Sequence, residues 1–171
     1  TMSATATMLR STADRTDRDL IEVLHRYAAD PTAWPMAPRF SPFGRWSAKL
    51  GGTDTYEVWL RTWMPGQGTD PHHHDLETTA FVVVSGVLTE LVGPRSADGH
   101  PDDGHASAHP ATLCSGDVRV LRPGLSHQIH NRHADLAVSV HVQTRGPATG
   151  TDVPAVRPAQ LTTAGTQRNR D

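Results

Sequence analysis

The feature that most constrains the fold is a series of short apolar segments separated by glycine turns. Apolar residues fill six segments, which we expect to be strands: residues 56–64, 80–84, 87–92, 112–114, 118–121 and 137–142. Turns are expected at four dipeptides: Pro65-Gly66, Ser85-Gly86, Ser115-Gly116 and Pro123-Gly124. Brief strands at such regular intervals predict an all-β domain, either an antiparallel sandwich or a barrel.

A single amphipathic helix is expected over residues 16–29, capped by Thr16 or Asp17 and ended by Asp30-Pro31. Its apolar face would carry Leu20, Ile21, Leu24, Tyr27 and Ala28. Residues 1–13 are small and polar and are expected to be disordered. Residues 148–171 lack periodicity, so this tail either wraps the barrel or is disordered. Residues 14–147 would then form a single domain.

Composition favours small-molecule chemistry. The net charge of −2 gives neither a basic stripe for nucleic acid nor an attraction to an anionic membrane. Cys114 is the only cysteine, which excludes an internal disulfide, and no segment is long and apolar enough to span a bilayer. We expect a cytoplasmic protein, a monomer or a homodimer, and the Arg-, Ala-, Thr- and Pro-rich composition is typical of actinobacterial proteins.

Histidines are the candidate metal ligands. Side chains alternate along a strand, so His72 and His74 can point into a cavity while His73 points outwards. With His127, which follows a later glycine turn, they would form a set of three neutral imidazoles. Such a set leaves coordination positions open, as catalytic metal sites do. Residues 94–110 are rich in Asp, Gly and His, and this composition predicts a long surface loop. His100, His105 and His109 in this loop are expected to be solvated.

These motifs resemble the cupin superfamily, in the order Gly66, His72-x-His74, Gly86, Gly116 and His127-x-x-x-Asn131. The resemblance implies a double-stranded β-helix (jelly-roll) barrel. Within cupins, the segments Trp63-x-Pro65-Gly66, Phe81 to Gly86 and Ala137 to His141 resemble the cysteine dioxygenase family, as a divergent bacterial member. That family converts a thiolate into a sulfinate, and the resemblance covers roughly residues 43–147.

Two positions differ from what the resemblance implies. Thr79 stands where most metal-binding cupins carry a glutamate ligand, which favours a three-histidine site. It also stands where animal cysteine dioxygenases carry a cysteine that is crosslinked to a tyrosine, and Gln143 stands at that tyrosine's position. No crosslink can form. Ser139, His141 and Gln143 share a strand face, so a Ser-His relay would end in an amide rather than a phenol.

The substrate pocket is expected to hold a carboxylate. The arginine that does so in the family has Ser47 at its position, and Arg45 and Lys49 lie nearby in the sequence. Arg61 is the favoured candidate for binding the carboxylate. Residues 59, 61 and 63 share a face, and the tryptophan at the position of Trp63 faces the pocket in the family. Alternatively, Arg61 lies on the outer face or pairs with Glu57 or Glu90. Thr79 and Phe81 would complete the substrate-binding residues.

The predicted function is a metal-dependent thiol dioxygenase that acts on a small thiol with O2, most simply L-cysteine, and gives a sulfinate or a further oxidised product, as in specialised metabolism. Fe(II) is the preferred metal, although three imidazoles also suit Ni(II) or another divalent transition metal. One alternative is a cupin lyase or isomerase, with Glu77, Glu90 or Tyr56 as the base. The other is a non-catalytic ligand-binding cupin.

Overall fold

The structure is a computed structural model that describes residues 3–74, 77–94 and 109–145, without the side chains of residues 3–14, 94 and 109. Its helices are α1 (Ser3–Ala29) and the short η1 (Pro31–Ala33). The strands follow in the order β1 (Ser47–Gly52), β2 (Tyr56–Trp63), β3 (His72–His73), β4 (Thr79–Ser85), β5 (Val87–Pro94), β6 (His109–Cys114), β7 (Val118–Leu121), β8 (Leu125–His130) and β9 (Ala137–Thr144).

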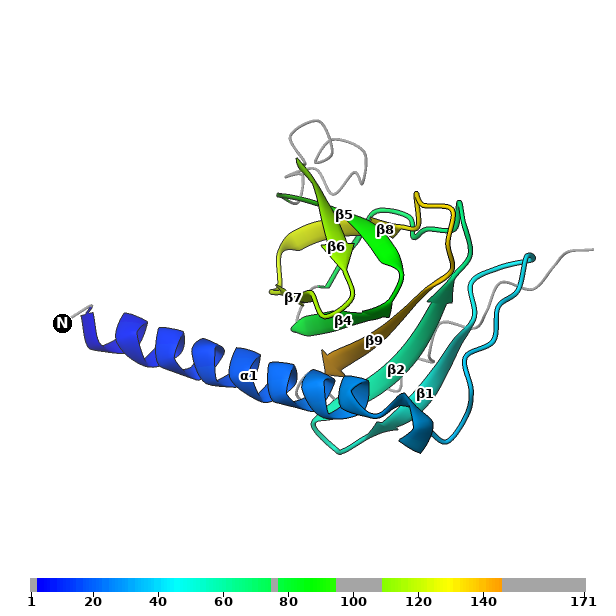
Figure 1. Cartoon of the computed structure of the whole chain (residues 1–171). Coiled ribbons are helices and arrows are strands. Elements are labelled where there is room, and N and C mark those ends of the chain that lie inside the picture. The colour runs from blue at the N-terminus through cyan, green and yellow to red at the C-terminus, as the bar shows by residue number, and fades with distance from the viewer. Residues whose placement is uncertain (1–2, 75–76, 95–108, 146–171) are drawn as a thin grey trace, which may run out of the picture.

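Two antiparallel sheets face each other. One has the strand order β1-β2-β9-β4-β7 and the other has the order β3-β8-β5-β6. Figure 1 shows the second sheet curving over the first, so that together they enclose an interior. This arrangement confirms the predicted all-β barrel with an N-terminal helix.

The chain has two apolar cores. The interior core contains Trp63, Phe81 and Val83 from one sheet and Leu88 and Ile129 from the other. The second core lies on the outer face of the five-stranded sheet, where α1 buries Leu20, Val23 and Leu24. In Figure 1 the helix runs along this sheet, and its first turns extend past it. Odd-numbered residues of β2 therefore face the interior, while Val58 and Leu60 face the helix side.

The predicted start of the helix at Thr16 is wrong. The helix begins at Ser3, so residues 3–13 are helical in the structure although disorder was expected. That segment contains no glycine or proline, and extending an existing helix costs far less than nucleating one. The C-terminal end is as expected, because α1 stops at Ala29 and Asp30 then caps η1.

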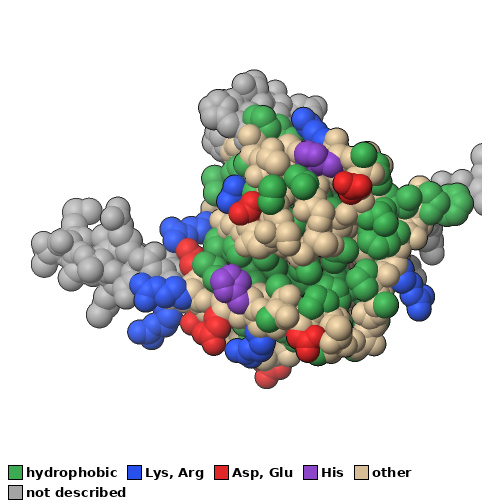
Figure 2. All heavy atoms as spheres, in the orientation of Figure 1, with side chains coloured by type: hydrophobic (Ala, Val, Ile, Leu, Met, Phe, Trp, Pro, Cys, Tyr) green, Lys and Arg blue, Asp and Glu red, His purple; other side chains and the backbone are tan. Residues whose placement is uncertain are grey.

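The six predicted strands are present, most of them with shifted ends, and β1, β3 and β8 are additional. The expected loop at 94–110, with His100 and His105, and the tail at 148–171 fall almost entirely outside the described residues. In the described part of the chain, no helix combines the length and apolarity that crossing a membrane requires. Figure 2 shows basic and acidic side chains interspersed on the face that it presents.

Candidate metal centre

Three histidines converge at the edge of the four-stranded sheet where β3 pairs with β8. His72 in β3 is the register partner of His127 in β8, and His74 follows β3. One ring nitrogen from each of the three lies within 4.8 Å of the other two. The Nε2 atoms of His72 and His127 are 3.0 Å apart. The predicted triad is therefore assembled in the structure, and among the described residues this cluster contains no carboxylate.

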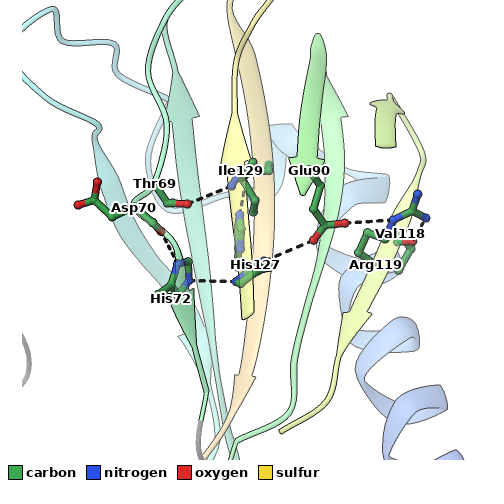
Figure 3. A network of polar contacts seen from close by, with 10 residues as sticks. Thr69, Asp70, His72, Glu90, Val118, Arg119, His127 and Ile129 are labelled. Atoms are coloured by element: carbon green, nitrogen blue, oxygen red, sulfur yellow. Dashed lines mark hydrogen bonds and ion pairs between the residues drawn. The ribbon is translucent and has the colours of Figure 1, made fainter. Parts of the chain in front are cut away.

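The opposite nitrogens of two of these rings have fixed partners. The Nδ1 of His72 lies 2.9 Å from the backbone oxygen of Asp70, and the Nδ1 of His127 lies 3.3 Å from Oε1 of Glu90 (Figure 3). Because both partners accept, each Nδ1 must donate, which leaves both Nε2 lone pairs facing the cluster. The Nε2 of His74 is buried, and no described residue forms a hydrogen bond with it. A metal ion bound by these nitrogens would satisfy all three.

The electrostatic surroundings keep two of these rings neutral at neutral pH. Burial, then the neighbouring His127, lowers the pKa of His72 to about 4. Burial, then His72 and His127, lowers the pKa of His74 to about 4. Neutral imidazole is the form that binds a metal. Since the rings are already neutral, binding would not have to displace protons from these two rings.

Glu90 is a residue of this site that the sequence analysis did not place there. It is almost fully buried, and its carboxylate lies between His127 and Arg119, whose Nε is 3.2 Å from Oε2. Figure 3 shows this line of contacts running from His72 through His127 and Glu90 to Arg119. A carboxylate that accepts from a ligating histidine fixes the ring and raises its basicity. The sequence did contain a signal for this placement. Glu90 lies two residues from both Leu88 and Val92, which face the interior, so strand alternation puts Glu90 on the same face.

Two residues hold the backbone around the cluster. Thr69 accepts from Ile129 N through its hydroxyl at 3.0 Å, and its own N–H donates to the Ile129 oxygen at 2.8 Å. These bonds place the segment before His72 beside β8. The amide of Asn131 donates to the Trp63 oxygen at 3.1 Å and to the Asp135 oxygen at 2.7 Å. Asn131 therefore stabilises a turn.

The opposite wall of the interior contains the predicted Ser-His pair. Ser139 Oγ lies 2.8 Å from His141 Nε2 and accepts from Trp63 Nε1 at 2.8 Å. Phe81 stacks on the His141 ring, with centroids 5.0 Å apart. Burial, then the charge of Arg61, holds the pKa of His141 well below its ordinary value. Ser139 and Phe81 therefore hold the His141 ring on this wall, and the lowered pKa keeps its imidazole neutral.

Gln143 does not continue the Ser-His relay. Its amide donates to the carboxylate of Glu77, whereas His141 is bonded to Ser139. It lies in register with Thr79, whose hydroxyl is buried without a hydrogen-bond partner. The register places Gln143 on the expected face, but the amide is turned towards a residue before β4. The expectation that an amide ends the relay is thus not met.

The two arginine candidates differ in their placement. Arg61 is the register partner of Ser139, and its Nε is buried without a hydrogen-bond partner in the described part of the chain, so it faces the interior. Burial, then the charge of Arg45, lowers the pKa of Arg61 to about 10. Arg45 is exposed, and its guanidinium lies 5.2 Å from the ring centre of Trp63. It therefore stands at the rim of the same interior.

The remaining described histidines lie outside the metal cluster. His73 is not part of it, in agreement with strand alternation. His130 lies in β8, and its backbone is bridged to that of Gly68. His133 has a buried Nε2 without a hydrogen-bond partner, and its N–H donates to Asn131.

A double-stranded β-helix barrel with three histidines converging on its interior defines a cupin of the metal-site type. The family model for cysteine dioxygenase type I matches residues 1–148, and the chain belongs to that family. No curated protein matches the sequence significantly.

Solved structures support the fold. TT1209 from Thermus thermophilus is 19% identical with a TM-score of 0.53, and the match covers 64% of this chain and 91% of that one. The cupin domain of Cnp3 from Schizosaccharomyces pombe is 11% identical with a TM-score of 0.51, covering 64% and 69%. KdgF from Halomonas sp. is 15% identical with a TM-score of 0.50, covering 64% and 86%. At these identities the similarity shows the fold alone.

Proposed function

We propose that this chain is a metal-dependent thiol dioxygenase. The observation that carries the proposal is a cluster of three histidines, without a carboxylate among the described residues, inside the barrel of a cysteine dioxygenase family member. A divalent metal on these nitrogens would supply neighbouring open positions for a thiolate and for dioxygen. Fe(II) is the proposed metal, with Ni(II) or another divalent transition metal as the alternative.

The proposed reaction transfers both oxygen atoms of O2 to the sulfur of a small thiol. A thiolate and O2 give a sulfinate, so two S–O bonds form, the O–O bond breaks and the four electrons come from sulfur. No external reductant is needed. L-cysteine is the simplest substrate. The proposal includes further transformation of the sulfinate in specialised metabolism. It also includes a cytoplasmic location.

The residues of the pocket have distinct proposed roles. Arg61 would bind a substrate carboxylate, because its Nε is buried and has no hydrogen-bond partner among the described residues. The neutral His141, fixed by Ser139, would donate or accept a hydrogen bond at the substrate without adding charge. Trp63 and Phe81 would keep water from the reacting atoms, since both are fully buried.

The test is anaerobic reconstitution of the full chain with Fe(II), Ni(II) or Co(II), followed by oxygen uptake on a panel of small thiols. We expect uptake that requires metal and thiol together and that His127→Ala abolishes. His73→Ala is the matched control, since it changes a neighbouring histidine outside the cluster. If no thiol supports metal-dependent uptake, the proposal is wrong and a non-oxygenase cupin is favoured.

A further inference from the structure

Among the described residues, the wall of the interior carries two guanidiniums, which is more positive charge than a substrate with one carboxylate would neutralise. Arg61 is enclosed between the sheets, and among the described residues it forms no ion pair. A buried guanidinium without an anion is costly, so a partner is expected to arrive with the substrate.

Arg45 adds a second guanidinium close by. It stacks over the face of Trp63, whose indole N–H donates to Ser139, the register partner of Arg61. Both arginines therefore border the wall formed by Trp63 and Ser139. Their proximity is also seen in the pKa of Arg61, which the charge of Arg45 lowers in addition to burial.

Among the described residues, the carboxylates near the two arginines do not pair with either of them at close range. Asp70 attracts Arg45 electrostatically but is exposed to solvent. The others have different partners in the described part of the chain, namely Glu57 with Lys49 and Arg145, Glu90 with Arg119, and Glu77 with Gln143. The two guanidiniums consequently remain available to a bound anion.

We propose that the substrate is a small thiol with two carboxylates, held by Arg61 inside the pocket and by Arg45 at its rim, with the thiolate directed to the histidine cluster. This inference rests on the proposed thiol dioxygenase function. Zwitterionic cysteine fits less well, because it supplies one carboxylate and brings an ammonium group into a field that is already positive.

The test of charge is equilibrium binding of sulfur-free acids. The full chain is loaded with Zn(II), which has no redox chemistry, and is titrated by calorimetry with succinate and with butyrate. We expect succinate to bind at least about tenfold more tightly, which is about 1.4 kcal/mol, close to the lower end of what one hydrogen bond to a charged group contributes. Arg61→Gln and Arg45→Gln should each reduce that ratio towards one, whereas Arg18→Gln on the exposed face of α1 should not.

The test of turnover compares thiols on the Fe(II)-loaded chain. We expect mercaptosuccinate to have at least about a tenfold higher kcat/KM than 3-mercaptopropionate or L-cysteine, with the ratio lost in Arg61→Gln. Equal or better turnover of a thiol with one carboxylate would overturn the dicarboxylate proposal and leave the dioxygenase proposal intact. Preferential binding of succinate without turnover of any thiol would support the charge argument and contradict the dioxygenase function.

Discussion

At the scale of single residues, the nitrogen that each histidine contributes determines whether metal binds. His127→Ala removes one of the three converging nitrogens, so we expect the bound metal to fall from about one ion per chain to near zero. His73→Ala should keep the metal, because that ring lies outside the cluster. Elemental analysis after gel filtration measures both. Retention by His127→Ala together with loss in His73→Ala would show that the strand register is wrong.

Glu90 is expected to set the strength of the metal site through His127. Glu90→Gln keeps the shape of the side chain but removes the negative charge that accepts from Nδ1. We predict a loss of about 10- to 100-fold in metal affinity, measured by competition with a chelator. The matched control is Glu22→Gln, which changes an exposed glutamate on α1. An unchanged affinity in Glu90→Gln would assign the carboxylate a role in packing only.

Residue types and spacing predicted the three histidines, whereas for Arg61 strand alternation and the family resemblance favoured the inward position and left the outer face open. Strand alternation fixes which side chains share a face, and both predictions used it. The partners of those side chains depend on the other sheet. Glu90 was considered a partner for Arg61, but it pairs with His127 and Arg119 across strands that the sequence alone could not bring into register.

At the scale of elements, the turn between β4 and β5 positions the strand that carries Glu90. Gly86 in this turn has a φ of 77°, and an added Cβ would lie 2.4 Å from the backbone oxygen of Leu136. Gly86→Ala should therefore destabilise the chain by about 1–3 kcal/mol, measured by urea unfolding. Gly44→Ala is the control, since nothing lies within 4 Å of its added Cβ. Equal stability of both variants would contradict the close approach.

The missed elements are those with weak local patterns. In β1 only Leu50 is buried, and the strand ends in two glycines, so its own residues give little β-strand signal. The strand is defined by its pairing with β2. The strand β3 has two residues and exists through its pairing with β8. The longer apolar strands were predicted because their own residues supply the burial. Pairing with a distant strand leaves no comparable local signal.

At the scale of the whole molecule, the buried His141 makes stability depend on pH. Its pKa in the folded chain lies well below the ordinary value of about 6.5 that it has when unfolded. As the pH falls below about 6.5, the unfolded chain binds a proton that the folded chain does not, so stability decreases. His141 should contribute a slope of up to about 1.4 kcal/mol per pH unit.

Urea unfolding of the metal-free chain, from about pH 7.5 to about pH 5.5, measures this slope. His141→Gln has no titrating ring, so its stability should fall less steeply than that of the unchanged chain over the same range. The comparison isolates His141 because the histidines of the metal cluster are common to both proteins. Parallel curves would show that His141 is protonated in the folded state.

The proposed reaction passes both atoms of dioxygen to one thiol sulfur. The most direct measurement is the mass of the product formed by the Fe(II)-loaded chain under isotopically labelled dioxygen. We predict a sulfinate, or a product derived from it, in which both added oxygen atoms carry the label. A product with one labelled atom, with oxygen from water alone, or with no added oxygen would contradict the claim.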